Sequence, residues 1–131
     1  MEVIKIETNY QFDFVNITTK IRNIVTESNI SSGLVTIFVP HTTAGVTINE
    51  GADPAVAEDI IKELNTIIPL RNNYSHLEGN SAAHIKSSLM GCSQNVIVEN
   101  GQLVLGTWQA IFFCDFDGPR HRKIFVKICE C

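Results

Sequence analysis

Two alternating segments on either side of Asn100-Gly101 constrain the fold more than any other feature of this sequence. They form the run QNVIVENGQLVLGTW, residues 94–108. Asn-Gly between two such segments is the strongest short-range signal for a β-hairpin, because both residues tolerate a positive φ. Apolar patterning predicts a further strand over 108–116 and a closing strand over 121–131. The last forty or so residues are therefore expected to be mostly β.

Alternating or continuous apolar runs predict four more strands, at residues 2–8, 10–15, 33–40 and 45–50. After the second of these, apolar residues at helical spacing predict a helix over about 17–28, with Asn16 as its cap. The run GLVTIFVP, residues 33–40, is apolar at most positions. Such a run is typical of a central strand that is covered on both faces.

Two further helices are marked by their first residues. Asp53-Pro54 places a capping carboxylate before a proline at the first helical position, and this helix is expected to end at about residue 68. Asn80 is a good cap for a helix over about 81–90. The predicted buried side of that helix consists of Ala82, Ile85 and Leu89. Together the elements predict an α+β fold: a single compact domain over residues 1–131, mainly an antiparallel β-sheet or sandwich of about 7–8 strands, with three helices.

Composition excludes several classes of partner. The 131 residues are 44% hydrophobic and 18% charged, with a formal net charge of −4. The sequence has no run of basic residues that would indicate a nucleic-acid partner, and it has no apolar run long enough to cross a bilayer. The chain is therefore expected to be cytoplasmic, without a nucleic-acid or membrane partner. The four cysteines form no C-x-x-C pair, so free thiols are the preferred interpretation, also for Cys129 and Cys131.

The segment HLEGNSAAH holds two of the four histidines. It places His76 and Glu78 in a loop and His84 in the first turn of the helix that follows. Imidazole and carboxylate groups bind divalent metals or transfer protons near neutral pH, so the segment is a candidate metal or catalytic site. The alternative is a surface loop with ordinary hydrogen-bonded histidines, and the spacing is not that of HExxH proteases.

A third histidine, His41, follows a predicted strand in the polar turn HTTAG. Polar turns at the ends of buried strands often carry sites, because the scaffold is rigid and the turn is accessible. Thr42 offers a hydroxyl, and Asn49 and Glu50 offer an amide and a carboxylate. Turn chemistry and solvation explain these residues equally well, and for Thr43 they are the preferred interpretation.

Two more polar groups lie near the C-terminus. The segment GTWQ contains the only tryptophan, Trp108, which is either a stacking surface or part of the core. A basic cluster at a turn-to-strand junction consists of Arg120, Arg122 and Lys123. Such a cluster can bind phosphate, and the alternative is solubility, which is preferred for Lys123.

Four ordered segments resemble the signature blocks of the YjbQ-like family, labelled secondary thiamine-phosphate synthase: HTTAGVTINEGADP, HLEGNSAAHIKSSLMG, GTWQ and DFDGPRHRK. The resemblance spans about residues 5–128. It implies a compact α+β domain that assembles as a homotrimer, with a divalent metal in its site. The histidines that match the family's pattern, and that the resemblance implies as metal ligands, are His41, His76 and His84.

The same resemblance implies roles for other residues. Catalytic roles are expected for Glu78, Thr107, Gln109 and Arg122. A ligand-binding role is expected for Trp108 on the same ground, and the polar and basic groups of their own segments suggest one for Thr42, Asn49, Glu50, Asn80 and Arg120. Many members of the family carry an acidic residue directly after Glu-Gly, where this chain has Asn80. The step that such a carboxylate serves is therefore expected to differ here.

These features predict a metal-binding enzyme with thiamine-phosphate synthase activity as its main or secondary role. That reaction displaces pyrophosphate from a pyrimidine carbon, so the leaving phosphates must be neutralised and the two rings held in line. Three histidines favour zinc, with Mg, Mn and Ni as alternatives. Because such a metal also activates water, the alternatives are a metal-dependent hydrolase of a small phosphorylated substrate and a non-catalytic metal- or ligand-binding protein.

Overall fold

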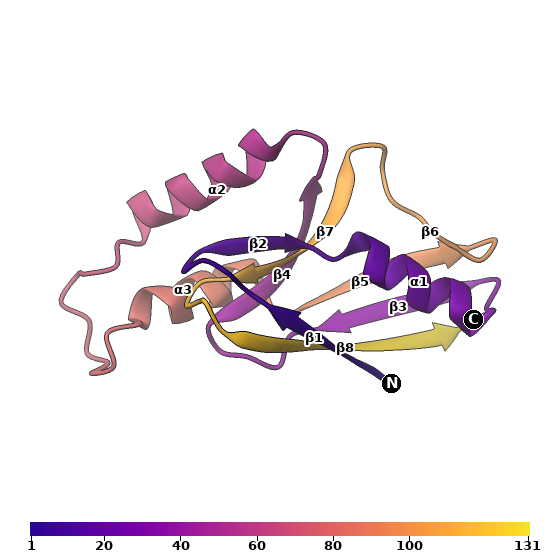
Figure 1. Ribbon diagram of the computed structural model, residues 1–131, viewed down its shortest axis with the longest axis horizontal. Coiled ribbons are helices and arrows are strands. Elements are labelled where there is room, and N and C mark those ends of the chain that lie inside the picture. Colours follow the sequence, from indigo (N-terminus) through magenta and orange to yellow (C-terminus); the bar gives the residue numbers. More distant parts are fainter.

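Two antiparallel sheets and three helices make up the protein, and the computed structural model describes residues 1–131 (Figure 1). The first sheet has the strand order β1 (Glu2–Glu7), β8 (His121–Glu130), β3 (Gly33–Phe38), β5 (Ser93–Glu99) and β6 (Gln102–Leu103). The second has the order β2 (Asp13–Asn16), β7 (Gln109–Asp115) and β4 (Ala44–Glu50). The helices are α1 (Thr18–Ser28), α2 (Pro54–Ile67) and α3 (Ser81–Met90). The predicted α+β fold, antiparallel with three helices, is confirmed.

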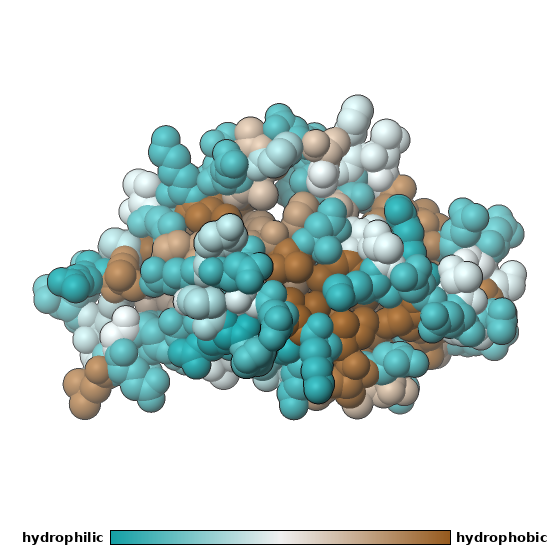
Figure 2. Space-filling model, viewed as in Figure 1, coloured by the Kyte–Doolittle hydropathy of each residue, from teal (hydrophilic) through white to brown (hydrophobic).

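The main hydrophobic core lies between the five-stranded sheet and a layer made of the three-stranded sheet and α1. Its buried members are Ile6, Val35, Ile37, Val96, Val98, Ile124 and Val126 from the first sheet, Val46, Ile111 and Phe113 from the second, and Ile21 and Val25 from α1. Each such side chain contributes about 1.5–3 kcal/mol when it leaves water. The core reaches the surface beside α1, where a cavity of about 260 Å³ is lined by Ile24, Val126 and Ile128. Figure 2 shows hydrophobic surface in the middle of the view, where β1 and α1 lie in Figure 1.

Strand β7 is covered on both faces, since six of its seven residues are buried. Ile111 and Phe113 point into the main core, whereas Phe112 and Cys114 belong to a second cluster under α3. The sequence assigns this double coverage to residues 33–40, and that prediction is wrong. Strand β3 alternates between buried and more exposed residues, because its outer face carries no second layer.

Helix α3 turns a different face to the body from the one predicted. Ala82 is buried as expected, but its buried companions are Ala83, Lys86 and Ser87, whereas Ile85 and Leu89 are exposed. The end of the helix lies very close to β4, where a Cβ added to Gly45 would come within 2.7 Å of the Gly91 carbonyl oxygen. Small side chains fit against a strand at such a distance, and large apolar ones do not.

Helix α2 begins as predicted, because Asp53 Oδ1 accepts a hydrogen bond from the Ala55 N–H at 2.9 Å. It nevertheless buries none of its residues, and Figure 1 shows it standing off from the strands. None of the three helices combines the length and the apolar character that a bilayer span requires. The helix is attached to the body through partly buried residues: Leu64 packs against the cluster under α3, and the Lys86 ammonium donates a hydrogen bond to Asn65 Oδ1.

The hairpin at Asn100-Gly101 is confirmed. Asn100 has a φ of 52° and Gly101 a φ of 73°. Two consecutive positive φ values define the type I′ turn that suits the twist of the flanking strands. The turn pairs Val98 with Leu103 and Glu99 with Gln102, so a local signal sets this register correctly.

Three segments cross from one sheet to the other at the same end of the molecule. They are residues 8–12, 39–43 and 116–120. The Thr8 N–H donates to the Arg120 carbonyl oxygen at 3.1 Å, and the Phe116 N–H donates to the Thr43 carbonyl oxygen at 3.1 Å. These bonds join the third crossing to each of the other two.

A buried ion pair between Asp115 and Arg122 lies where the crossings meet. Asp115 is inaccessible to water and Arg122 is only 7% exposed. Arg122 Nη2 donates to Asp115 Oδ1 at 2.7 Å, and Arg122 Nε donates to Asp115 Oδ2 at 3.1 Å, which is a bidentate arrangement. The Thr8 hydroxyl also donates to Asp115 at 2.7 Å, and Arg122 donates to the Thr43 hydroxyl at 2.8 Å. The pair therefore ties all three crossing segments together.

Replacing Arg122 by methionine should lower the free energy of unfolding by about 3–5 kcal/mol, because the Asp115 carboxylate is left buried without its cation. Urea unfolding followed by circular dichroism measures this loss. The matched control is Arg120→Met, since the ion pair of Arg120 with Asp117 is solvent-exposed and its loss should cost at most about 1 kcal/mol. Equal losses for the two variants would contradict the role given to the buried pair.

Candidate functional site

The residues predicted to share one site fall in three places: the two ends of the β4–β7 pair, and the loop before α3 together with the start of that helix. The register places Ala44 opposite Asp115 at one end and Glu50 opposite Gln109 at the other. At about 3.4 Å per residue, the two ends are roughly 20 Å apart. A single chain therefore does not gather all the predicted residues, and the two ends carry different groups.

The end away from the crossings holds Asn49, Glu50 and GTWQ. All of GTWQ is exposed, and Trp108 is 64% exposed. Gln109 Oε1 accepts a hydrogen bond from the Gly106 N–H at 2.8 Å, and Asn49 Oδ1 accepts one from the Glu50 N–H at 2.7 Å. Both amides thus serve the local backbone, and Trp108 presents a bare aromatic surface.

His41 lies at the other end, in the second crossing. Its Nε2 accepts a hydrogen bond from the Lys123 N–H at 3.0 Å, and its ring meets the Phe113 ring edge-on with centroids 6.5 Å apart. In a neutral imidazole whose Nε2 accepts, the proton sits on Nδ1. His41 therefore offers an N–H donor rather than a free basic nitrogen.

Two effects keep the His41 ring neutral at pH 7. Partial burial lowers its pKa below the ordinary value of 6.5, and the positive charge of Arg122 lowers the pKa further. The charge of Arg122 is itself permanent and compensated by Asp115. Burial raises the pKa of the Asp115 carboxyl, but hydrogen bonds from Arg122 and Thr8 lower it, and the net pKa lies below its ordinary value.

His41 lines a cavity of about 510 Å³ beside β1 and β8. The other lining residues are Lys5, Ile6, Glu7, His121, Arg122 and Lys123. This volume lies within the range of small-molecule sites, which is about 300–1,000 Å³. The cavity is formed by side chains from two paired strands and one crossing segment, so its walls belong to the rigid part of the fold.

Positive charge in this cavity is only partly compensated. Lys5 pairs directly with Lys123 across the β1–β8 ladder. Glu7 Oε1 lies 3.0 Å from His121 Nδ1, and both side chains are well exposed. No carboxylate lies within ion-pair distance of either lysine ammonium. Like charges directly opposite one another destabilise an antiparallel pair, so a bound anion would relieve the repulsion between the two lysines.

The segment HLEGNSAAH brings its own predicted residues together. The rings of His76 and His84 are 5.2 Å apart between centroids and nearly perpendicular, and His76 Nε2 lies 3.8 Å from Glu78 Oε2. His76 lines a separate cavity of about 330 Å³ in the loop before α3. His41 does not line that cavity, so the three histidines do not share one.

Asn80 occupies the N-cap position directly before α3, but its side chain makes no capping hydrogen bond. Its Nδ2 donates to Asp117 Oδ2 at 3.0 Å, while its buried Oδ1 has no hydrogen-bond partner. Arg120 Nη2 also donates to Asp117, at 3.0 Å. An acidic residue at position 80 would face the Asp117 carboxylate, so an amide suits this position in the present chain.

Several residues of the cavity beside His41, and of the ion-pair network around Arg122, are not predicted from the sequence. It does not single out Lys5 or Asp115, and it assigns Thr43 to turn chemistry and Lys123 to solubility. The proximity of Lys5 and Lys123 depends on the pairing of the first strand with the last, which has no local signal. One signal in the sequence did indicate the buried ion pair. Arg122 takes an inward position in its alternating strand, where the other residues are apolar, and a buried arginine requires an acidic partner.

The full length of the chain matches a known family. The family model described as UPF0047 protein YjbQ-like matches residues 2–131. A UPF0047 protein of Methanocaldococcus jannaschii is 56% identical over 124 residues, which cover 95% of this chain and 90% of that protein. The UPF0047 protein YugU of Bacillus subtilis is 46% identical over 129 residues, which cover 98% of both.

Solved structures share the fold over nearly all residues. An uncharacterized conserved protein of Clostridium acetobutylicum has a TM-score of 0.97 at 52% identity, and the match covers 98% of this chain and 100% of that chain. A YbjQ-like protein of unknown function from Sulfolobus solfataricus has a TM-score of 0.95 at 34% identity, with 99% and 96% covered. The likeness therefore extends to the segments that carry the cavity.

The function expected from the sequence is contradicted. These relatives are named as UPF0047 proteins or as a protein of unknown function, and none bears the name of a thiamine-phosphate synthase. In this chain no three histidine, cysteine or carboxylate side chains are grouped so that they could hold a metal ion. The metal-dependent synthase, together with its hydrolase and metal-binding alternatives, is thus set aside. The separate expectation of a divalent ion as cofactor, with zinc first, stays a prediction.

Stability should fall below about pH 6.5 in a way that depends on His41. Above that pH the ring is neutral in both folded and unfolded chains. Below 6.5 the unfolded chain binds a proton that the folded chain excludes, because the folded pKa is lower, so the free energy of unfolding decreases. Urea unfolding between about pH 5 and pH 8 should show this loss in the natural protein and in His121→Gln, but a smaller loss in His41→Gln. The same pH dependence in all three proteins would contradict the assignment.

Proposed function

We propose that this chain, which belongs to the YjbQ-like UPF0047 family, binds a small anionic molecule in the cavity beside His41. A phosphorylated compound is the expected class. The observation that carries the proposal is the direct pairing of Lys5 with Lys123, without a carboxylate partner for either, in the wall of that cavity.

The physical basis is charge compensation. Side chains directly opposite one another in an antiparallel pair have Cβ atoms about 4.5–5.5 Å apart, so the two ammonium groups can reach one ligand together. A phosphate dianion would neutralise both and accept short charge-assisted hydrogen bonds from them. The Nδ1–H of His41 supplies a further donor, because its Nε2 is occupied by the Lys123 N–H.

Arg122 has a different part in this proposal. Its guanidinium is bound bidentately by Asp115, so its charge is not free for the ligand. Arg122 joins two walls of the cavity. It donates a hydrogen bond to the Thr43 hydroxyl, two residues from His41, and it is the neighbour of Lys123 in β8. Lys5, Lys123 and His41 are then the ligand-contacting residues.

Replacing Lys5 by alanine should weaken the binding of inorganic phosphate and of phenyl phosphate at least tenfold, since one charge-assisted contact is worth about 1.5–3 kcal/mol. The same change should raise the free energy of unfolding of the ligand-free protein by about 0.2–1 kcal/mol, because the like-charge pair is removed. Calorimetric titration and urea unfolding measure the two effects.

Lys127→Ala is the matched control for this experiment, because Lys127 is an exposed lysine of β8 that lines a different cavity. It should leave phosphate affinity unchanged. The proposal fails if the natural protein shows no saturable binding of either compound at millimolar concentration. It also fails if Lys5→Ala binds them as tightly as the natural protein.

We also propose that the chain works as a homotrimer. The outer face of the five-stranded sheet carries large apolar side chains that water reaches: Val3, Leu34, Phe38 and Ile97. They are neighbours in the sheet, since Leu34 pairs with Ile97, Val3 pairs with Phe125, and the Phe38 and Phe125 rings are stacked with centroids 6.3 Å apart. An apolar face of this kind favours association, and identical head-to-tail contacts close into a ring of three.

Light scattering after size exclusion should give a mass of three times 14.5 kDa for the natural protein. Phe38→Asp should reduce the mass toward that of one chain, because it places a charge in the apolar face. Leu77→Asp is the control, since Leu77 is 98% exposed in the loop before α3 and outside this face. A stable monomer of the natural protein at micromolar concentration would refute the proposal.

A further inference from the structure

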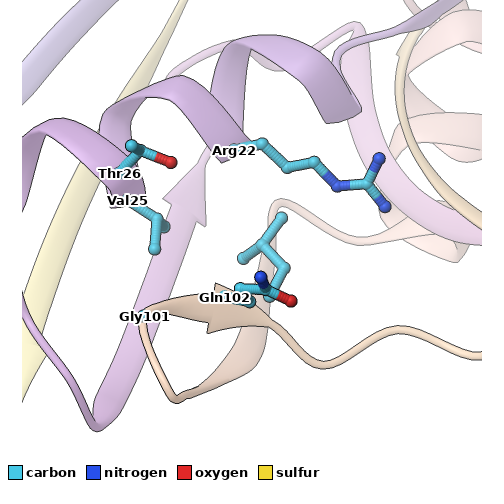
Figure 3. Close-up of a pocket in the computed structure, with 6 residues that line it drawn as sticks. Arg22, Val25, Thr26, Gly101 and Gln102 are labelled. Carbon is cyan, nitrogen blue, oxygen red and sulfur yellow. The ribbon is translucent and has the colours of Figure 1, made fainter.

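A second candidate binding cavity, of about 330 Å³, lies between α1 and the β5–β6 hairpin (Figure 3), apart from the cavity of similar volume that His76 lines. Its lining consists of Arg22, Val25 and Thr26 from α1 and of Gly101, Gln102 and Leu103 from the hairpin. The three helix residues share one face because they are spaced three and four positions apart. None of the six lines the cavity beside His41, and none lies in a segment that the sequence marks as functional.

The walls of this second cavity are fixed by the fold. Val25 is 1% exposed and belongs to the main core, and Leu103 packs against the same core. The Gly101 N–H donates to the Ser31 carbonyl oxygen at 2.9 Å, which ties the hairpin turn to the loop after α1. A ligand would therefore meet a preformed floor, of which Leu103 is the apolar part that water reaches, and would not have to order it.

The polar groups around this floor are unused. Arg22 forms no ion pair, and the side chains of Arg22, Thr26 and Gln102 make no hydrogen bond within the chain. In Figure 3, Arg22 extends from α1 away from Val25 and Thr26, and Gln102 lies below it on the hairpin. Arg22 is also the only charged residue of the lining.

We propose that this cavity binds a small monocarboxylate with an apolar body. The guanidinium matches a carboxylate in a planar, bidentate geometry, and one positive charge balances one negative charge. The Gln102 amide and the Thr26 hydroxyl add hydrogen bonds at the rim. The apolar part of the ligand would cover Leu103, since Val25, the other hydrophobic residue of the lining, is already buried in the core.

Phosphate is the less suitable ligand here. It has no apolar part for the floor, and as a dianion it needs more than the single cation of this cavity. The two cavities are therefore expected to have opposite preferences: phosphate beside Lys5 and Lys123, and an apolar carboxylate beside Arg22.

The test is a titration of isotopically labelled protein with benzoate, followed by two-dimensional NMR. Benzoate should shift the signals of the Gly101 amide and the Gln102 side-chain amide in a saturable manner, and Arg22→Gln should weaken this binding at least tenfold. Lys20→Gln, an exposed lysine of the same helix outside the lining, and Lys5→Ala should both leave it unchanged. The spectrum of Arg22→Gln without ligand shows whether the fold is intact.

Three outcomes would overturn the inference. The first is the absence of saturable shifts at Gly101 and Gln102 with benzoate at millimolar concentration. The second is equal affinity for benzoate and for neutral benzamide, which would remove the role of the carboxylate. The third is a preference for inorganic phosphate over benzoate at these same signals, which would indicate unspecific anion attraction.

Discussion

Burying Asp115 and Arg122 costs several kcal/mol of desolvation free energy per ion, and only a near-ideal arrangement offsets such a cost. The arrangement found here has two parallel hydrogen bonds between the ions and one further bond from each ion to a threonine hydroxyl. Those threonines, Thr8 and Thr43, belong to the two other crossing segments. The buried ion pair is therefore stable only when all three crossing segments are folded. The crossing segments, in turn, are joined to one another through Asp115 and Arg122.

The same pair determines the chemistry of the neighbouring cavity. Because Asp115 compensates Arg122, the guanidinium acts on His41 as a fixed charge that helps to keep the ring neutral, and it takes no part in binding. The position of β8 then places the Lys123 N–H on His41 Nε2 and the Lys123 side chain opposite Lys5. The anion binding that we propose at this place would follow from strand pairing, with His41 as a hydrogen-bond donor to the ligand.

Signals that act within a few residues predicted the local structure well. Asp53 and Asn100-Gly101 are examples, because a cap or a type I′ turn is decided by the residues that form it. Predictions failed where distant parts of the chain decide. Apolar composition alone could not tell that β7 would be covered twice and β3 once, nor that α3 would turn Ala83 rather than Leu89 to its strand. The candidate site shows the same division, since the motifs mark His41 and Trp108, whereas the separation of these two residues follows from the register of β4 and β7.

One buried ion pair holds three distant segments as a unit, and native-state hydrogen exchange measures this cooperativity most directly. The amides of Thr8, Phe116 and Lys123 donate hydrogen bonds at the three crossings. If the claim is right, all three exchange with one common free energy of opening, as members of a cooperative unit do. Three values that differ by more than about 1 kcal/mol would show that the crossings open independently, and would contradict the central role of Asp115 and Arg122.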